Sequence, residues 1–317
     1  MTEQSIIYPP ALMPGDTIAI ISPATTVKEE YVLGAERRLQ ELGYKVRIMP
    51  GTLGPADGSY ASSAERRLKD LQDAIADADI KAILCARGGY GAVHLLEHFD
   101  TETLRRNPKW LIGYSDISAL HAMMRRAGVA SIHAPMAKHL STEPEDDAAI
   151  NALLQILRGN DSLTYNLDAH PYNVCGEASG ELRGGNLAVL AGLIGTEFDI
   201  LTPEEEEDVV LFIEDISEAI YSTERMLYNL HLNGSLRRIK ALIIGQFTET
   251  RADKNFESTH SMIHSLLKRL GYGDLPVAFD FPVGHVSHNM PMIEGSQCHI
   301  KITPQGVEFT QQINQKK

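Results

Sequence analysis

A serine stands where an apolar segment of the chain ends and a helical pattern begins. Residues 110–114 (WLIGY) are apolar, Ser115 follows them, and Asp116 opens a stretch with helical spacing. A serine at a sharp strand-to-helix turn exposes its hydroxyl beside the N–H groups and the positive dipole end of the helix, which suits a nucleophile whose attack creates an oxyanion. A second reading stays open, in which Ser115 or Asp116 only caps the helix, because Ile117 stands where G-x-S-x-G has its second glycine.

A glycine-rich segment, CARGGYG at residues 85–91, follows the preceding apolar segment. Glycines allow a tight bend that turns backbone N–H groups toward a ligand. The spacing is neither G-x-G-x-x-G nor that of a Walker motif, which argues against a nucleotide phosphate. In an acyl-transfer site this loop would supply the second N–H group of an oxyanion hole, and an ordinary glycine turn is the alternative.

A serine nucleophile needs a base, and the base needs a carboxylate that orients it. Among twelve histidines, His285 stands out because it lies in a loop, FPVGH, directly after an apolar segment. Glu214 and Asp215 end the apolar segment VVLFIED, and spacing does not decide which of them, if either, enters a site. His260 and His264 have the i, i+4 spacing of metal ligands, but without H-E-x-x-H an exposed helix face is the better interpretation.

The first half of the chain alternates apolar segments of strand length with amphipathic helical spacing. We expect strands at residues 16–24, 45–50, 80–86, 110–114 and 129–134. Strands without polar alternation form a parallel sheet covered by helices on both faces. We therefore predict a doubly wound, flavodoxin-like α/β domain over residues 1–160, with Ser115 at its ligand-binding edge. Ser62 and Glu65 have the spacing of a capping box and predict the start of one helix.

Residues 159–185 are polar, turn-rich and glycine-rich, and we place the domain boundary there. Beyond it we predict a smaller mixed α/β domain over residues 175–317, which ends in a hairpin around residues 304–306. Because the nucleophile candidate lies in one domain and the base and carboxylate candidates in the other, we expect the site where the two domains meet.

Composition narrows the class of protein. The formal net charge of −13 argues against a nucleic-acid partner, since no basic stripe is present. Three scattered cysteines without a C-x-x-C pair indicate a reducing compartment and no thiolate metal cluster. The sequence shows neither a signal-peptide pattern nor an apolar run long enough to span a membrane. We therefore expect a cytoplasmic protein without a membrane partner, a metal or a cofactor.

Taken together, these segments resemble the LD-carboxypeptidase family, which includes the microcin C immunity peptidases. The resemblance extends in order and spacing from about residue 10 to residue 310. It rests on the segments PGDTIAIISPA, RGGYGA, LIGYSDISAL, HAPM, GGNLAVLAGLIGT, LFIEDISEAIYSTERML, IIGQFT and PVGH.

The resemblance implies a serine carboxypeptidase that releases terminal D-alanine from murein tetrapeptides during peptidoglycan recycling and that forms a homodimer. It implies Ser115 as the nucleophile, His285 as the base and Glu214 as the carboxylate that orients the base. It also implies a set of oxyanion-hole and substrate-binding residues: Gly88, Gly89, Asp116, Arg183, Asn186 and Arg225.

Two other functions remain as alternatives. One is a microcin-immunity-type peptidase, which would use the same three residues on an aminoacyl-nucleotide analogue. The other, from a different class, is a two-domain protein that binds a small molecule without chemistry. A binding protein has no reason to place a serine, a histidine and a glutamate together, so labelling of Ser115 by a fluorophosphonate would count against it.

Overall fold

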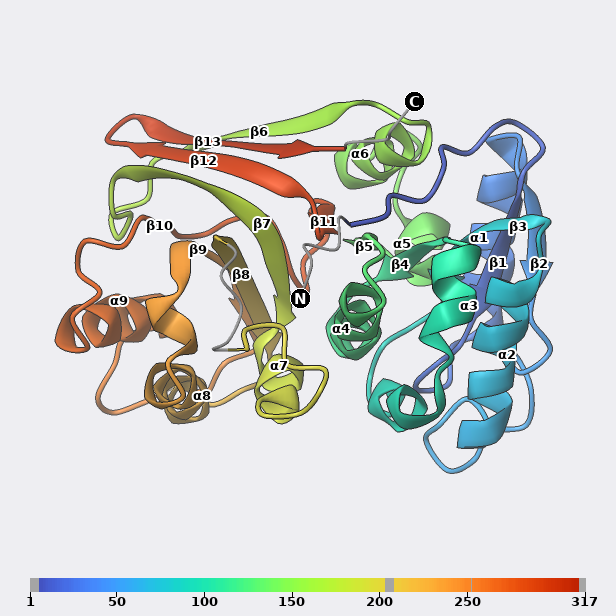
Figure 1. Ribbon diagram of the computed structural model, residues 1–317, viewed down its shortest axis with the longest axis horizontal. Helices are drawn as coiled ribbons and strands as arrows, with labels where there is room; N and C mark the ends of the chain where they lie inside the picture. The colour runs from blue at the N-terminus through green and yellow to red at the C-terminus, as the bar shows by residue number, and fades with distance from the viewer. Residues whose placement is uncertain (1–5, 203–207, 252, 314–317) are drawn as a thin grey trace. The chain divides into compact units, whose positions relative to one another are not determined.

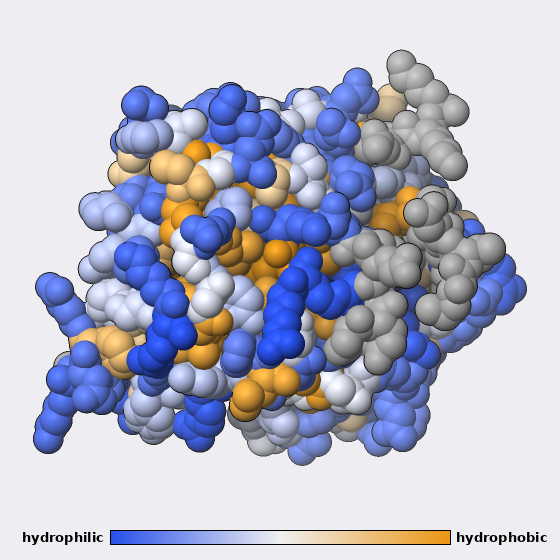
Figure 2. All heavy atoms as spheres, turned by 60° about the vertical axis from the view of Figure 1, so that its left-hand side comes forward, coloured by the Kyte–Doolittle hydropathy of each residue, from blue (hydrophilic) through white to orange (hydrophobic). Residues whose placement is uncertain are grey.

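A computed structural model describes residues 6–202, 208–251 and 253–313 (Figure 1). The chain divides into two units, and each is made of separate stretches of sequence. The first contains Met1–Asp161, Met290–Gly295 and Ile313–Lys317, and the second contains Ser162–Asn289 and Ser296–Gln312. None of the described helices is long and apolar enough to cross a bilayer. Figure 2 shows hydrophobic patches between hydrophilic residues on one face, as is usual for globular proteins.

The first unit holds a six-stranded sheet in the order β11-β5-β4-β3-β1-β2. Its strands are β1 (Thr17–Ile21), β2 (Lys45–Ile48), β3 (Ile80–Cys85), β4 (Trp110–Gly113), β5 (Ser131–His133) and β11 (Met292–Glu294). Strands β1 to β5 pair in parallel, whereas β11 runs antiparallel to β5. The order 2-1-3-4-5 is that of a flavodoxin-like sheet, so the predicted fold class of this half is confirmed.

Helices cover this first sheet on both faces (Figure 1). The α-helices described in this unit are α1 (Glu29–Glu41), α2 (Ala64–Ala76), α3 (Thr101–Arg106), α4 (Ser118–Arg126), α5 (Ala137–Thr142) and α6 (Ala148–Leu157). Helix α1 packs against α5, while α3 contacts both α2 and α4. The predicted cap of α2 is wrong by one residue. Ser63, not Ser62, accepts the N–H of Arg66, and the carbonyl of Ser62 accepts a hydrogen bond from the side chain of Arg67.

The second unit holds a seven-stranded mixed sheet in the order β10-β9-β8-β7-β12-β13-β6. Its strands are β6 (Ser162–Asp168), β7 (Gly176–Asn186), β8 (Val209–Ile216), β9 (Ile239–Thr248), β10 (Val277–Ala278), β12 (Gln297–Thr303) and β13 (Gly306–Gln312). Strands β7 to β10 are parallel, and β12, β13 and β6 continue the sheet in antiparallel pairs. The mixed α/β class is confirmed.

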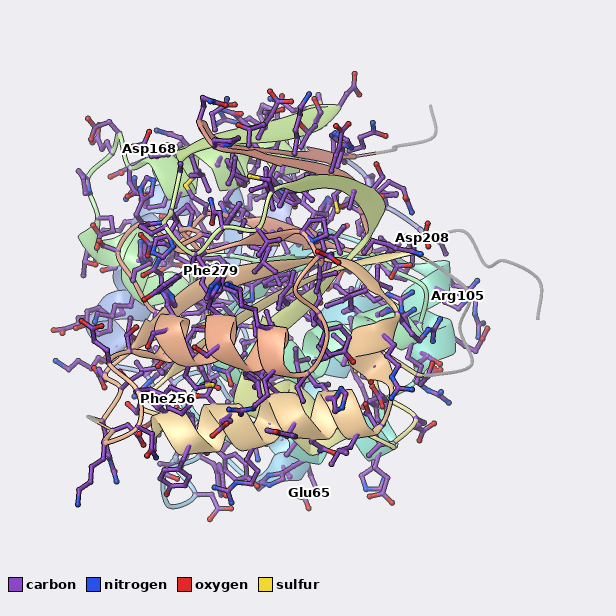
Figure 3. The ribbon with its side chains drawn as sticks, turned by 90° about the vertical axis from the view of Figure 1, so that its left-hand side faces the viewer. Glu65, Arg105, Asp168, Asp208, Phe256 and Phe279 are labelled. Atoms are coloured by element: carbon purple, nitrogen blue, oxygen red, sulfur yellow. The ribbon has the colours of Figure 1, made fainter. Side chains whose placement is uncertain are left out.

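Among the described residues of this unit, the α-helices are α7 (Leu187–Leu193), α8 (Ile220–Leu232) and α9 (Thr259–Arg269). Helices α8 and α9 run side by side across one face of the unit, as Figure 3 shows. Each of α7 and α8 follows a parallel strand, so their N-terminal ends lie at the carboxyl edge of the sheet, where ligands bind in such folds.

The glycine-rich segment that we interpret as a boundary contains strands β6 and β7. A Cβ atom at Gly180 would lie 2.5 Å from the carbonyl oxygen of Asp208, and one at Gly184 would lie 2.1 Å from that of Phe212. These glycines therefore let β7 approach β8 closely, and the turn interpretation of this segment is wrong.

The chain also returns to the first unit after the second has begun. Strand β11 pairs with β5, with Met292 opposite His133, and so belongs to the first unit. The predicted division into residues 1–160 and 175–317 does not include this return of the chain to the first unit. The segment is only three residues long, too short for a periodicity to reveal it in the sequence.

Candidate active site

The backbone turns sharply at Ser115. This residue has φ 68°, a left-handed conformation that is costly for a residue with a side chain, and the 3₁₀ turn Ser115–Ile117 leads into α4. A Cβ atom at Gly113 would lie 3.0 Å from Cγ1 of Ile117 and 3.1 Å from Cβ of Cys85. Glycine is therefore needed before the turn, and the side chain of Ile117 packs onto it. The geometry is that of a serine held on a strained strand-to-helix turn.

The helix-cap interpretation of this segment is wrong. Neither the 3₁₀ turn nor α4 has a side-chain cap. The buried carboxylate of Asp116 instead accepts the N–H of Ala92 at 2.8 Å. Burial raises the pKa of Asp116, whereas the Ala92 N–H and the charges of His94 and Arg67 act in the opposite direction. Asp116 thus links the serine turn to the loop after β3.

The glycine loop lies directly against the serine. A Cβ atom at Gly88 would lie 2.9 Å from Cβ of Ser115 and 3.1 Å from its Oγ. Thr25 fixes the loop by donating its hydroxyl to the carbonyl of Gly88 at 2.6 Å, and Gly89 has φ 105°. Within residues 6–202, 208–251 and 253–313, the N–H groups of Gly88 and Gly89 have no acceptor. The loop can therefore present N–H donors next to the Ser115 hydroxyl.

In the second unit, Glu214 and His285 form a direct contact. Nδ1 of His285 lies 2.8 Å from Oε2 of Glu214, which is fully buried near the end of β8. Gly284 has φ 131° and passes so close that a Cβ atom there would lie 3.0 Å from the Glu214 carboxylate, and Asn289 accepts its N–H. A carboxylate can only accept, so Nδ1 carries the proton and Nε2 is the basic nitrogen of the neutral ring.

Glu214 and Asp215, between which the sequence spacing does not decide, have different hydrogen-bond partners in the structure. His285 contacts Glu214, whereas Asp215 accepts hydrogen bonds from Nδ2 of Asn186 and from the N–H of Ala188, both at 2.9 Å. Burial raises the pKa of Asp215 to about 6 against these hydrogen bonds, and the neighbouring Glu214 adds to the rise. Asn186 also caps α7 through Val189, so Asp215 is part of the structural start of that helix.

The remaining predicted pocket residues have very different surroundings. Arg183 is buried and holds Glu181 through two hydrogen bonds of 2.8 and 3.2 Å, and it also donates to the carbonyl of Ile200. Arg225 is exposed on α8, and its guanidinium lies 5.4 Å from the ring centre of Tyr221. Arg183 therefore anchors β7, and its role toward a substrate stays a prediction, as does that of Arg225.

A cavity of about 340 Å³ lies at the start of α8. Its lining is formed by Ala219, Ile220, Tyr221, Arg251, Asp253, Lys254 and Asn255. No sequence motif marks this cavity, because Arg251 and Lys254 belong to none. They carry two of the positive charges in a chain whose net charge is −13.

The interpretation of His260 and His264 as an exposed helix face is wrong. Both are half-buried on α9, where His260 packs edge-on against Phe279 and His264 stacks on Tyr172. Burial lowers the pKa of both histidines. Phe279 is labelled beside α9 in Figure 3. These histidines therefore serve as packing residues of the second unit.

Potential metal ligands gather at two places among the described residues: His121, His133 and Glu294 at one, and His139, Glu143 and Asp147 at the other. His121 is fully buried, with its Nδ1 2.8 Å from Oγ of Ser131 and its Nε2 2.9 Å from the carbonyl of Gly113. Burial lowers the pKa of His121 to about 4, so its ring is neutral. It is a structural histidine.

Comparison with known families identifies both halves of the chain. Residues 18–134 match the LD-carboxypeptidase N-terminal domain, and residues 179–300 match the C-terminal domain of the same family. The chain belongs to the LD-carboxypeptidase family. The resemblance read from the sequence segments is thereby confirmed, and the chain is classed as a peptidase.

Several relatives cover most of this chain. A probable murein peptide carboxypeptidase of Bacillus subtilis is 33% identical over 92% of the chain and 90% of its own length. The murein tetrapeptide carboxypeptidase of Pseudomonas aeruginosa is 32% identical over 88% of each protein. The crystal structure of muramoyltetrapeptide carboxypeptidase from Oxalobacter formigenes, 26% identical, covers 95% of this chain and 100% of its own with a TM-score of 0.84. The microcin C7 self immunity protein MccF shares the fold, with a TM-score of 0.83 at 22% identity over 97% of this chain and 98% of its own.

Proposed function

We propose that this LD-carboxypeptidase is a serine peptidase that releases terminal D-alanine from murein tetrapeptides. The observation that carries the proposal is the 2.8 Å contact between the buried Glu214 carboxylate and Nδ1 of His285. A buried carboxylate on one nitrogen of a histidine prepares the other nitrogen as a base. The strained turn at Ser115 supplies the matching nucleophile in the other unit.

The reaction follows from these groups. Nε2 of His285 accepts the proton of the Ser115 hydroxyl as its oxygen attacks the carbonyl of the residue before D-alanine. The negative oxygen that forms is held by the N–H groups of Gly88, Gly89 and Asp116, and each such donor lowers the barrier by roughly 3 kcal/mol. The imidazolium, stabilised by Glu214, returns the proton to the nitrogen of D-alanine as the C–N bond breaks. Water then hydrolyses the acyl-enzyme and releases the tripeptide.

The substrate class rests on the relatives, two of which are named for murein tetrapeptide or muramoyltetrapeptide carboxypeptidase activity and cover nearly the whole chain. The resemblance further supports a cytoplasmic enzyme of cell-wall peptide recycling that forms a homodimer. A substrate that ends in a carboxylate needs a local cation or N–H donor here, because the net charge of −13 repels anions.

The deciding experiment measures D-alanine release from purified murein tetrapeptide by the parent protein and by Ser115→Ala. We expect release by the parent and none above background by the variant. Equal release by the two proteins would remove Ser115 from its proposed role. Absence of release by the parent would contradict the substrate.

The fold similarity to MccF keeps a microcin-immunity-type activity as the alternative. Trp110, the one tryptophan, is buried in β4 and donates its indole N–H to the carbonyl of Pro10, so it offers no face to a nucleobase. The same two proteins should therefore also be assayed with an aminoacyl-sulfamoyl nucleoside. Turnover of that compound alone would favour the alternative.

A further inference from the structure

One peptide group of the glycine loop is held from both of its ends. The carbonyl of Gly91 accepts a hydrogen bond of 2.8 Å from Nη1 of Arg67. The N–H of the same peptide group belongs to Ala92 and donates to Asp116 at 2.8 Å. A buried cation and a buried carboxylate thus fix the orientation of this single peptide plane.

Arg67 reaches this carbonyl from helix α2, and its side chain is almost fully buried. It also donates to the carbonyls of Pro23 at 2.6 Å and of Ser62 at 3.0 Å. Its guanidinium therefore ties together the loop after β1, the residue that precedes the cap of α2, and the loop after β3. Only a planar guanidinium offers several donors in a fixed arrangement of this kind.

The ring of Tyr60 covers this guanidinium, whose carbon lies 5.1 Å from the ring centre, and Nη2 lies 3.3 Å from Nδ1 of His94. Burial lowers the pKa of Arg67, while Tyr60 and Asp116 act in the opposite direction and favour the charged form. Because removing a guanidinium from water costs free energy, its hydrogen-bond partners must hold it in place. The same hydrogen bonds fix the three segments relative to one another.

The hydrogen bond between Asp116 and Ala92 connects this peptide group to the turn at Ser115. Asp116 directly follows Ser115, so the peptide group that Arg67 holds is also hydrogen-bonded to the residue after the proposed nucleophile. Three residues before Gly91, the backbone of Gly88 lies against Ser115. A shift of the loop by an ångström would move its N–H groups away from the place where the oxyanion forms.

We propose that Arg67 is a positioning residue of the oxyanion hole, which holds the loop of Gly88 and Gly89 against the Ser115 turn through Gly91. Arg67 touches no substrate in this role. The inference rests on the proposed function, because it assumes that these N–H groups stabilise the transition state. Loss of Arg67 should therefore lower the rate of the chemical step and leave substrate binding nearly unchanged.

The experiment compares Arg67→Met, Arg67→Lys and Arg67→Ala with the parent, and uses Arg66→Met as the matched control. Arg66 is the neighbouring arginine, partly exposed and paired with Asp70 at 3.4 Å. Two readouts are needed: kcat and KM for D-alanine release, and the rate at which a small fluorophosphonate labels Ser115. In that labelling the serine oxygen displaces fluoride from phosphorus, and the phosphonyl oxygen occupies the oxyanion hole without any murein substrate.

For Arg67→Met we expect kcat and the labelling rate to fall by about 10²-fold, the usual cost of a misplaced catalytic group, with KM changed by less than about threefold. Arg67→Lys should lose less, because the ammonium group keeps the charge but cannot reach all three carbonyls. Added guanidinium ion should restore part of the rate of Arg67→Ala, and Arg66→Met should behave as the parent does.

A folded Arg67→Met protein with both rates within about threefold of the parent would overturn the inference, as would a rise of KM at unchanged kcat. If Arg67→Met does not fold, Arg67→Lys decides, and a labelling rate equal to that of the parent contradicts the role. A parent that labels at Ser115 but releases no D-alanine would contradict the proposed substrate alone. A parent that is neither labelled at Ser115 nor able to release D-alanine would contradict both proposals.

Discussion

Gly88 and Ser115 lie so close that a single added methyl group would press on the serine. The Cβ atom of an alanine at position 88 would lie 2.9 Å from Cβ of Ser115 and 3.2 Å from the backbone nitrogen of Asp116. We expect Gly88→Ala to displace the serine or the loop and to lower kcat by about 10²-fold, as misplacement by an ångström does. D-alanine release checks this, with Gly192→Ala as the control, since a Cβ atom there meets nothing within 4 Å. Full activity of Gly88→Ala would mean that the site tolerates a shift.

The contact between Glu214 and His285 predicts that a substitution which keeps the shape of the site will still abolish most of the activity. Glu214→Gln keeps the size of the side chain but can donate to Nδ1, which favours the tautomer with the proton on Nε2. We expect kcat for D-alanine release to fall by about 10³- to 10⁴-fold, by analogy with the orienting carboxylate of other serine hydrolases. Glu224→Gln, an acid on α8 that pairs with Arg269, serves as the control. A Glu214→Gln protein with parental kcat would show that His285 needs no carboxylate.

The left-handed backbone conformation of Ser115 predicts that a residue with a side chain at this position lowers the free energy of unfolding. Its φ of 68° is unfavourable for any residue with a Cβ atom, by about 1–2 kcal/mol, and glycine escapes that cost. Ser115→Gly should therefore be more stable than Ser115→Ala, by about 1 kcal/mol after the larger backbone entropy of glycine is subtracted. Urea unfolding of these two inactive variants gives the difference. A Gly variant that is the less stable of the two would show that the turn is not strained.

Local sequence pattern is sufficient to locate the strands that carry the candidate site. The strands before Ser115 and Glu214 are continuous apolar runs, and such runs locate buried parallel strands well. The position of Ser115 at the turn can be predicted, because the end of a strand and the start of a helix are both recognisable in the sequence. Local pattern thus predicts Ser115 at the sheet edge of the first unit, whereas in the second unit it predicts only the adjacent acids Glu214 and Asp215.

Long-range packing decides what local pattern does not reveal. Gly180 and Gly184 have the composition of a turn, yet β7 needs them to approach β8. Glu214 and Asp215 are adjacent acids, and only the positions of His285 and of Asn186 tell them apart. The role inferred for Arg67 could not be predicted from the sequence either, because Arg67 donates to the backbone carbonyls of Pro23 and Gly91, which lie in distant loops.

The buried imidazole of His121 predicts how stability depends on pH. Burial lowers the pKa of His121 from 6.5 to about 4, so between these pH values the unfolded chain binds a proton that the folded protein does not. Unfolding is therefore favoured progressively as pH falls through this window, and the total loss is roughly 3 kcal/mol at pH 4 and below. His121→Gln removes the titrating group, so the difference in melting temperature between the parent and this variant should shrink from pH 7 to pH 4. Ser131→Ala, which removes one partner of the ring but keeps the ring, should show the same acid-side loss as the parent. A difference between the parent and His121→Gln that stays constant over this range would mean that the folded protein protonates His121 as readily as the unfolded chain does.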